Sequence, residues 1–285
     1  LAAFNQLGYS VEWRVINAAD YGRAQRRRRV FFFVFRNDTK WGERLHTKYE
    51  ATLSNDADLN ARLDCYAPYI FEDGLFGRQF PVKNEAVKKR INANKLDEDI
   101  AEVSANFSDG KMWNSGLMTN GYYYTIETEP KGDEEPIPMK KIVVKENQVP
   151  EDYYVDGEKL EKFKYLRGPK KITRTAANGH TYTFSEGGMS EYDSLELPGR
   201  TMLTSEGSVN RSTHLLKIDG KYRLITPIEA ERLQDFPDDW TRYKRNAKGE
   251  VVEVSDRMRM FFMGNALVTG IVKRIGDELQ KIDAI

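Results

Sequence analysis

The residues best suited to chemistry form a run of arginines beside a short apolar segment. Gln25 is followed by four arginines, Arg26–Arg29, and then by the apolar run Val30–Phe35. A guanidinium offers a planar fork of donors, which suits it to hold a phosphate or the edge of a base. A run of arginines can equally be a solvated turn, because charge runs usually face water. The block by itself leaves anion binding and plain surface charge as open alternatives.

The apolar run after the arginines predicts the element that would hold them in place. Val30–Phe35 is short, aromatic and β-branched, which favours a strand buried on both faces over a helix. Val11–Ile16 alternates weakly and predicts a second strand, and residues 1–7 predict the end of a helix that stops at Gly8. We therefore expect the edge of an open sheet, with the arginines at fixed positions on it.

Composition limits the class of protein. The chain has 285 residues, 40% of them hydrophobic, and a formal net charge of +0, so it can bury a core but does not coat nucleic acid by bulk charge. It contains no apolar run of membrane-spanning length and no signal-peptide pattern. Cys65 is the single cysteine, which excludes a disulfide framework and favours a cytoplasmic, reducing compartment. Because the three histidines are scattered, no metal site is expected.

The distribution of charge predicts one basic face. Residues 1–49 carry ten Lys and Arg against four Asp and Glu, and residues 162–174 carry six Lys and Arg and no acid. Acidic residues gather between 97 and 161, which indicates a solvating face elsewhere. The pattern also begins in the middle of a helix at Leu1, so we expect the chain to be part of a longer protein.

The rest of the chain reads as a β-rich middle and a helical end. The middle predicts a helix over Lys83–Val103, strands at Tyr122–Ile126 and Lys141–Lys145, a loop or domain boundary at 129–138, and an irregular β-rich module over 175–220. At the end, Thr226, Pro227 and Glu229 predict a capped helix start, with the helix running to about Gln234. A last helical region, 258–282, is broken at Gly264-Asn265; we expect it to pack on the sheet through Leu267, Ile271, Ile275 and Leu279.

Three blocks, in this order, resemble the C-terminal part of the DNA cytosine-5 methyltransferases. Residues 15–30 contain the Gln-x-Arg-x-Arg pattern of motif VIII, residues 223–237 resemble motif IX, and residues 263–268 (Met-Gly-Asn-Ala-Leu-Val) resemble motif X. The variable stretch between the first two, roughly 45–220, takes the place of the target-recognition region.

The resemblance implies an α/β fold in three parts. Residues 1–45 would be the C-terminal strands of a Rossmann-like, mostly parallel catalytic sheet. Residues 46–250 would form a smaller, β-rich target-recognition domain that includes motif IX, and residues 251–285 would return to the catalytic domain as a helix. Double-stranded DNA would lie between the two domains.

The resemblance also implies a reaction and roles in it. A cytosine is flipped out of the duplex, a cysteine thiolate adds to C6, and C5 takes a methyl group from S-adenosylmethionine. Arg29 would contact the carbonyl oxygen of the flipped base, where a fixed cation stabilises developing negative charge. Arg27 and Gln25 would position Arg29 and nearby phosphates. Arg26 and Arg28 are expected to be surface charge.

Further site residues follow from the same resemblance. Asn265 and Ala266 match positions beside the cofactor pocket, where a helix start would offer free N–H groups. Glu229 and Arg232, on one helical face, are expected to be structural and to pin the recognition module to the larger domain.

DNA contacts are predicted in the variable stretch. The segment 197–202 resembles one whose threonine contacts the DNA backbone, so Arg200 and Thr201 are candidate phosphate contacts; an ordinary β-turn is the alternative. Lys170, Lys171 and Arg174 are candidate groove or phosphate contacts, with a solvated basic face as the alternative. Specificity is expected from loops within residues 150–215.

The nucleophile of the family is missing from this sequence. The family's cysteine stands in a Pro-Cys dipeptide, whereas Cys65 follows Asp64; the Phe-x-Gly-x-Gly and Glu-Asn-Val blocks are also missing. We therefore expect the target-recognition half of a restriction–modification methyltransferase, inactive alone, with S-adenosylmethionine and the nucleophile held mainly by an N-terminal half or subunit. The alternative is a non-catalytic, sequence-specific DNA-binding fragment or an inactive paralogue. An RNA-binding or scaffold protein is disfavoured because no aromatic RNA-module signature is present.

Overall fold

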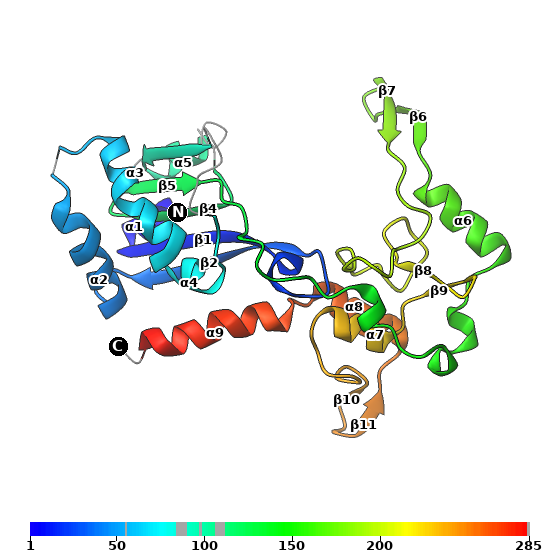
Figure 1. Cartoon of the computed structure of the whole chain (residues 1–285). Coiled ribbons are helices and arrows are strands. Elements are labelled where there is room, and N and C mark those ends of the chain that lie inside the picture. The colour runs from blue at the N-terminus through cyan, green and yellow to red at the C-terminus, as the bar shows by residue number, and fades with distance from the viewer. Residues whose placement is uncertain (55, 84–89, 97–98, 106–111, 284–285) are drawn as a thin grey trace. The chain divides into compact units, whose positions relative to one another are not determined.

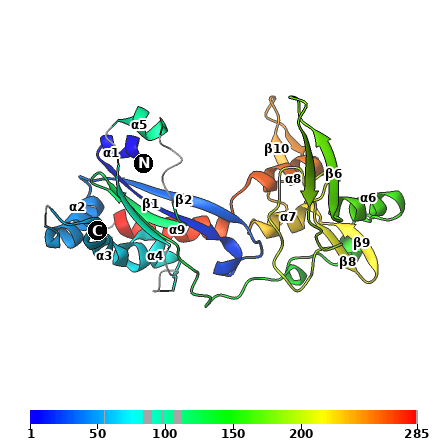
Figure 2. The same cartoon turned by 90° about the horizontal axis from the view of Figure 1, so that it is seen from above.

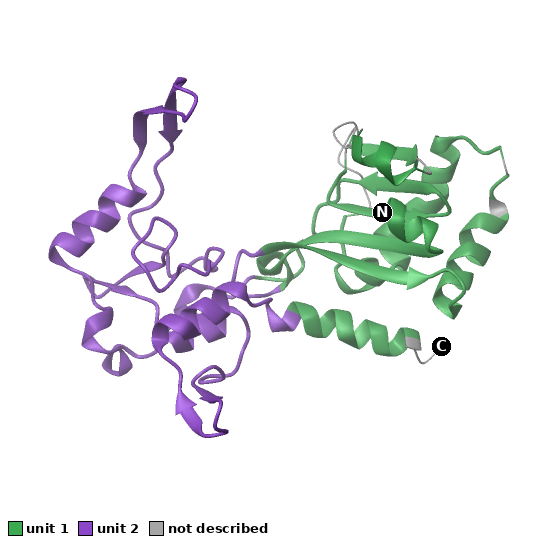
Figure 3. Ribbon diagram, turned by 180° about the vertical axis from the view of Figure 1, so that it is seen from behind, with its two compact units in different colours: residues 1–21, 28–135, 271–285 green, residues 22–27, 136–270 purple. Residues whose placement is uncertain are grey.

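The chain forms two compact units. The computed structural model describes residues 1–54, 56–83, 90–96, 99–105 and 112–283 (Figure 1). Unit 1 consists of residues 1–21, 28–135 and 271–285, and unit 2 of residues 22–27 and 136–270 (Figure 3). The main division lies between residues 135 and 136, inside the segment 129–138 that the sequence predicts as a loop or domain boundary.

Unit 1 is built on a five-stranded sheet with the strand order β2-β1-β4-β5-β3. The strands are β1 (Tyr9–Asn17), β2 (Arg28–Arg36), β3 (Ile91–Lys95), β4 (Ser115–Thr119) and β5 (Tyr122–Ile126). Every pairing in this sheet is antiparallel, so the mostly parallel sheet that we predicted is not what these strands form. Helices accompany the sheet, and the fold is mixed α/β.

The strand after the arginines is an edge strand. We predicted burial on both faces, but Val30 is 48% and Phe32 59% exposed, and only Phe35 is buried among the residues of β2. The correction follows from topology, since β2 pairs with β1 alone. β1 lies between β2 and β4 and is the strand with a buried centre. An apolar run shows that a segment tends to form a strand, but it does not show whether that strand lies at the centre or at the edge of the sheet.

Helices cover unit 1 at several points. They are α1 (Ala2–Gln6), α2 (Lys40–Tyr49), α3 (Leu59–Pro68), α4 (Leu75–Gln79), α5 (Ile100–Ala105) and α9 (Thr269–Asp283), with short 3-10 or π turns at Ala18–Tyr21, Glu50–Thr52 and Tyr69–Asp73. The helix predicted over 83–103 is wrong at its centre, which is strand β3; residues 84–89 and 97–98 of that range lie outside the described residues. The strand predicted at Tyr122–Ile126 is confirmed.

Two buried ionisable side chains, Glu12 and Arg14, tie the central strand to α4 and the residue after it. The Glu12 carboxylate, 1% exposed, accepts the main-chain N–H groups of Leu75 at 3.0 Å and Phe76 at 2.8 Å, at the first turn of α4. Arg14, two residues further along the same face of β1, donates to the carbonyl oxygen of Phe80 at 2.8 Å. Burial raises the pKa of Glu12 to about 6, although Arg14 and the two N–H groups oppose the shift. The pair holds α4 against the middle of the sheet.

The last helix returns to unit 1, as predicted. Ile271 is 2% exposed, and the buried carboxylate of Glu278 accepts bonds from Arg78 at 3.1 Å and Gln79 at 2.8 Å. Leu267 differs from the prediction, since it precedes α9 and is 41% exposed. The middle of α9 is therefore what attaches the end of the chain to unit 1.

Unit 2 combines short two-stranded sheets with three helices and much irregular chain. The strands are β6 (Lys170–Thr175), β7 (Thr181–Glu186), β8 (Leu215–Ile218), β9 (Lys221–Leu224), β10 (Tyr243–Arg245) and β11 (Val251–Glu253), and the helices are α6 (Gly157–Arg167), α7 (Pro227–Leu233) and α8 (Asp256–Asn265). Single turns of 3-10 helix lie at Met139–Lys141, Glu146–Gln148 and Glu151–Tyr153. The irregular chain predicted for 175–220 is confirmed, but its strands are limited to β7 and β8 and the last residue of β6, so the segment is less β-rich than predicted. The strand predicted at Lys141–Lys145 is wrong.

Helix α7 starts as its sequence predicts. The Thr226 hydroxyl accepts the N–H of Glu229 at 3.3 Å, the Glu229 carboxylate accepts the N–H of Thr226 at 2.7 Å, and Pro227 occupies the first turn. This reciprocal pair is a capping box.

Among the helices in the described part of the chain, none is both long and apolar enough to cross a lipid bilayer.

Candidate functional site

The arginine block lies where the chain leaves unit 2 and enters unit 1. Gln25 and Arg27 belong to unit 2 and are buried, with exposures of 0% and 3%. Arg26 and Arg28 are exposed, as expected of surface charge. Arg29 follows in β2 of unit 1 and is half-buried. Buried and exposed side chains therefore alternate along residues 25–28, and the buried ones can stabilise the fold while the exposed ones remain accessible to a ligand.

Arg27 connects two distant segments of unit 2. Its Nη1 donates to the carbonyl oxygen of Met202 at 2.8 Å, and its Nη2 donates to the carbonyl oxygen of Gly264 at 2.9 Å. Gly264 lies in the last turn of α8, where carbonyl groups lack helical partners and a cation is favoured by the helix dipole. Arg27 therefore completes the end of α8 and fixes the segment around Met202 beside it.

Gln25 also connects distant segments of unit 2 through its side-chain amide. Its Nε2 donates to the carbonyl oxygen of Leu233 at 3.3 Å, and its Oε1 accepts the N–H of Met202 at 3.2 Å. The main chain pairs as well, because the N–H of Gly199 donates to Ala24 at 2.7 Å in a short parallel bridge. The block and residues 197–202 are thus held together by both main chain and side chain.

The three blocks that carry the family resemblance meet inside unit 2. Gln25 and Arg27 represent the first block, and the amide of Gln234 at the end of the second donates to the carbonyl oxygen of Met263 in the third at 2.7 Å. Packing leaves no room for a side chain at Gly264, where an added Cβ would lie 2.4 Å from the carbonyl oxygen of Leu203. Segments far apart in sequence therefore form one tightly packed junction.

Arg29 presents a guanidinium that the described protein does not neutralise. It lies opposite Ile16 in the β1–β2 pairing, and its Nη1 donates to the carbonyl oxygen of Arg28 at 2.7 Å. Within the described ranges no carboxylate is paired with it. A half-buried cation without a carboxylate partner is available for a developing negative charge on a ligand.

Asn265 and Ala266 lie at a helix end, which corrects the physical reason given for them above. Asn265 is the last residue of α8, and the N–H of Ala266 already donates to the carbonyl oxygen of Phe262 at 2.9 Å; α9 begins only at Thr269. Free N–H groups of a helix start are therefore not what these two residues offer. The exposed amide side chain of Asn265 is the accessible polar group.

Arg200 belongs to a buried charge network that the sequence did not reveal. Its guanidinium pairs with Asp193, which also accepts from Arg167 at 2.9 Å and from the N–H of Leu215 at 3.0 Å. Burial by itself would raise the pKa of Asp193, but the hydrogen bond from Arg200 and the neighbouring charges of His214 and the two arginines hold it well below its usual range. An aspartate among turn residues carries no sequence signal for such a role.

Of the other predicted DNA contacts, some side chains bond within the protein and others are exposed. The Thr201 hydroxyl donates to the carbonyl oxygen of Arg26 at 2.6 Å. Lys170 is internal, because its Nζ donates to the carbonyl oxygen of Leu166 at 2.7 Å and pairs with Glu186 at 3.2 Å. Lys171 and Arg174 point outward from the β6–β7 hairpin and are exposed. They are the accessible members of the predicted set.

Glu229 and Arg232 stabilise unit 2 from within. Glu229 is fully buried, pairs with Arg223 at 2.8 Å and accepts the N–H of Val144 at 2.9 Å. Arg232 pairs with Asp238 at 2.7 Å. All these partners lie in unit 2, so the contacts support a structural role inside that unit.

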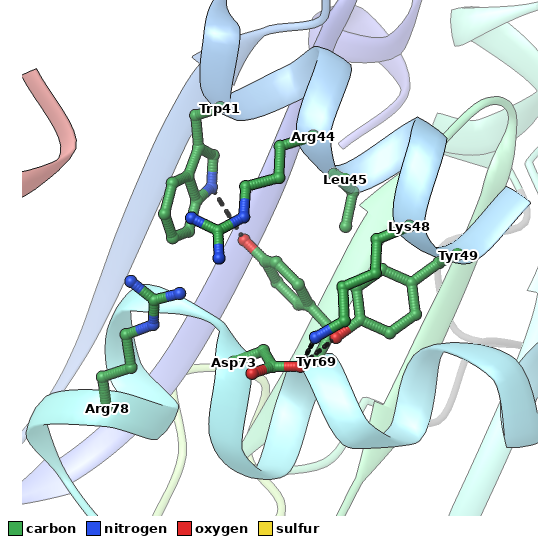
Figure 4. Close-up of a pocket in the computed structure, with 8 residues that line it drawn as sticks. All are labelled: Trp41, Arg44, Leu45, Lys48, Tyr49, Tyr69, Asp73 and Arg78. Carbon is green, nitrogen blue, oxygen red and sulfur yellow. Dashed lines mark hydrogen bonds and ion pairs between the residues drawn. The ribbon is translucent and has the colours of Figure 1, made fainter. Parts of the chain in front are cut away.

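A small pocket in unit 1 is unsuited to a cofactor (Figure 4). It is lined by Trp41, Arg44, Leu45, Lys48, Tyr49, Tyr69, Asp73 and Arg78. Its polar groups largely satisfy one another, since Trp41 donates to the hydroxyl of Tyr69 at 3.1 Å and both Lys48 and Tyr49 bond to Asp73. Its volume of about 20 Å³ holds little more than one water molecule.

Comparisons with known proteins identify the family of this chain. A family model described as C-5 cytosine-specific DNA methylase matches residues 1–281. The chain is 48% identical over 285 residues to the Type II methyltransferase M.Sau3AI of Staphylococcus aureus, and it spans 62% of the length of that relative. A solved structure of the Entamoeba histolytica methyltransferase EhMeth matches 68% of this chain and 56% of its own, at 12% identity and a TM-score of 0.31, which is too low to support an argument. The family match over almost the whole sequence establishes that this chain belongs to the C-5 cytosine-specific DNA methylases.

Proposed function

We propose that this chain is the target-recognition part of a DNA cytosine-5 methyltransferase of a restriction–modification system. The enzyme would transfer a methyl group to C5 of a flipped cytosine in a short, specific duplex site. Family membership and the 48% identity to a Type II methyltransferase support this. The observation that carries it is the junction in which buried Gln25 and Arg27 join the three blocks, while Arg29 has no carboxylate partner among the described residues.

Arg29 would act on the flipped base. Its guanidinium would donate to the carbonyl oxygen of cytosine, where negative charge builds as the ring is attacked at C6. Gln25 and Arg27 would act through position only, because their side chains are already bonded to Leu233, Met202 and Gly264. They set where the chain leaves unit 2 just before Arg29.

The nucleophilic cysteine would come from outside this chain. Cys65 stands in α3, and its thiol donates to the carbonyl oxygen of Tyr49 at 2.9 Å. It is not part of a Pro-Cys dipeptide. An N-terminal half, on the same longer protein or on a separate subunit, would therefore supply the thiolate, and this chain should not methylate DNA alone.

S-adenosylmethionine would supply the methyl group in the complete enzyme. The residues of this chain fit only one edge of a site for it. The exposed amide of Asn265 is free to contact a ligand, whereas the N–H of Ala266 is already used within α8. The N-terminal half would provide most of the contacts, and Arg27 would hold the end of α8 in place beside them.

Recognition of duplex DNA is assigned to unit 2, within the predicted range 46–250. Lys171 and Arg174 on the β6–β7 hairpin are accessible cations, and the Thr201 hydroxyl keeps lone pairs for a donor. Arg200 and Lys170 would contribute indirectly, since Asp193 and Glu186 already hold their charges. A two-stranded ribbon such as β6–β7 can enter a major groove.

A methyl-transfer assay tests the proposal. Labelled S-adenosylmethionine and duplex DNA are incubated with this chain alone, with an N-terminal half that carries the Pro-Cys, and with both together. We expect methylated C5 only with both. Transfer by this chain alone would contradict the assignment of the nucleophile. Duplex binding without transfer in the complete mixture would favour the non-catalytic DNA-binding alternative.

A further inference from the structure

The hairpin β10–β11 has no role in the assignment so far, although its surface is unusual. Tyr243 is 57% and Val251 62% exposed. The register sets Tyr243 opposite Glu253 and Arg245 opposite Val251, so these side chains share one face of the ribbon. An aromatic ring, a guanidinium and an aliphatic group therefore stand together in solvent. These are groups that contact sugars and phosphates in protein–DNA interfaces.

The outer part of the hairpin carries unneutralised positive charge. Lys244, Arg245 and Lys248 have no carboxylate partner in the part of the chain that the structure describes. Arg242 at the base differs, because it pairs with Glu253 at 3.0 Å. Arg245 donates one N–H to the carbonyl oxygen of Gly249 at 2.9 Å, which leaves its charge uncompensated. Residues 242–253 carry four Lys and Arg against two Glu, and this net positive charge is complementary to a polyanion.

The hairpin is rigid at both ends. At its base, the buried carboxylate of Glu231 accepts the N–H of Thr241 at 2.9 Å and pairs with Arg259 at 3.0 Å. At its tip, the side chain of Asn246 accepts the N–H groups of Lys248 at 2.9 Å and Glu250 at 3.0 Å. A preformed arm loses less conformational entropy on binding than a loop that must order.

The predicted DNA-contacting hairpin has the same combination of side chains. In β6–β7, Arg174 lies opposite Tyr182 and Ile172 lies opposite Phe184, and the Arg174 guanidinium stacks on the Phe184 ring at 4.1 Å. The two hairpins lie at opposite ends of unit 2 in Figure 1, yet Figure 2 shows that both project from the same side of that unit. A ligand spread over that side could contact both.

We infer that β10–β11 is a second DNA-contacting arm, which binds the sugar–phosphate backbone of the duplex that β6–β7 contacts. The inference rests on the proposed function. Arg245 and Lys248 donate to phosphates on the face where Tyr243 packs against sugar, and Lys244, on the other face of the ribbon, donates to a neighbouring phosphate. The Asn246 side chain is used within the turn, since its oxygen accepts two N–H groups and its amide donates to Glu250 at 2.8 Å. With the cations assigned to phosphates, the arm adds affinity that does not depend on sequence.

Salt-dependent binding tests the inference. The complete methyltransferase that contains this chain is titrated with a duplex that carries its site and with an unrelated duplex, over a series of salt concentrations. The test variant is Lys244→Ala/Arg245→Ala/Lys248→Ala. The control, Lys141→Ala/Lys145→Ala/Lys159→Ala, removes the same charge from exposed positions of unit 2 outside both hairpins.

We expect the test variant to lower the slope of log K against log salt by about 2 to 3, because each phosphate contact contributes about 0.9. Both duplexes should be weakened by the same factor, and the control should keep the wild-type slope. An unchanged slope in the test variant, or an equal loss in the control, overturns the inference. A loss confined to the specific duplex also overturns it, since that would make the arm a base reader.

Failure of the proposed function gives a different result. If the wild-type enzyme binds no duplex, the proposed function itself fails. If it binds and the test variant binds equally well, only the inference about the arm fails. Thermal unfolding confirms that each variant is folded. Should the triple variant unfold, the single variants Lys244→Ala and Lys248→Ala replace it, each with an expected slope change of about 0.9.

Discussion

The guanidinium of Arg27 donates to the carbonyl oxygen of Gly264 at 2.9 Å, across 237 residues of sequence. This contact joins two of the blocks that define the family, and it lies in the interior of unit 2. The same guanidinium also donates to the carbonyl oxygen of Met202, so Arg27 holds these two segments together and should stabilise unit 2.

Arg27→Ala should lower the free energy of unfolding by about 3 kcal/mol, because two buried carbonyl groups lose charged donors. Arg27→Lys should recover only part of the loss, since an ammonium cannot span both carbonyls as a planar fork does. Urea denaturation followed by circular dichroism measures the change. Arg26→Ala is the matched control on an exposed neighbour and should be nearly neutral; an equal loss in both variants would show that burial of Arg27 is not the cause.

Arg29→Ala in the complete enzyme should reduce kcat by about 10² to 10³, the effect of losing one preorganised donor to developing charge. Duplex affinity should change little, because the contact strengthens only in the transition state. Single-turnover methyl transfer and equilibrium DNA binding separate the two effects. Arg28→Ala, an exposed neighbour, should keep near-normal turnover. Normal turnover by Arg29→Ala would remove Arg29 from the active site.

Glu12 should make stability depend on pH. Burial raises its pKa from 4.5 to about 6, so the folded state holds the proton more tightly than the unfolded state. Its stabilising contribution is complete below pH 4.5 and declines as the pH rises through about 6, by about 2 kcal/mol in total. Unfolding free energies of wild type and Glu12→Gln, compared across this window, measure the effect. The difference between the two proteins should vary with pH; a constant difference would contradict the prediction.

Gly264→Ala should destabilise the protein by about 1 to 3 kcal/mol, as overpacking of a tight site does. The new methyl group would lie 2.4 Å from the carbonyl oxygen of Leu203. Gly276→Ala is the matched control, because it lies inside α9 with nothing within 4 Å of its added Cβ. It should be neutral or stabilising by up to about 1 kcal/mol. Thermal unfolding of both variants measures the change in melting temperature, and equal changes in the two variants would show that crowding at Gly264 has no effect.

Local chemistry made parts of the fold predictable. Thr226 and Glu229 predict the start of α7 because a capping box is formed between residues only three positions apart in the sequence. Gly8 ends α1 with a φ of +76°, which a glycine tolerates readily. Such features depend on neighbours in sequence, and the structure has them where they were expected.

Features set by distant partners could not be predicted in the same way. The run Val30–Phe35 is β-prone, but its place at the edge of the sheet depends on which strands pair with β1. The segment Lys141–Lys145 contains three consecutive β-branched residues and yet forms no strand.

The candidate site shows the same division. The family resemblance marked Gln25 and Arg27 as positioning residues, and their burial agrees with such a role. The sequence could not show that Asp193 holds Arg200, because the partners of a charged side chain are chosen by the folded chain. Nor could it show that Ala266 ends a helix whose N–H groups are already in use.

Unit 2 is made of two pieces, and the short piece, residues 22–27, has a consequence for engineering. An exchange of specificity between relatives would naturally transplant residues 136–270 as a cassette. Gln25 and Arg27 remain with the recipient, however, and they need acceptors at the positions of Met202, Leu233 and Gly264 in the donor. A chimera will fold only when the incoming cassette preserves the surfaces that receive these two side chains.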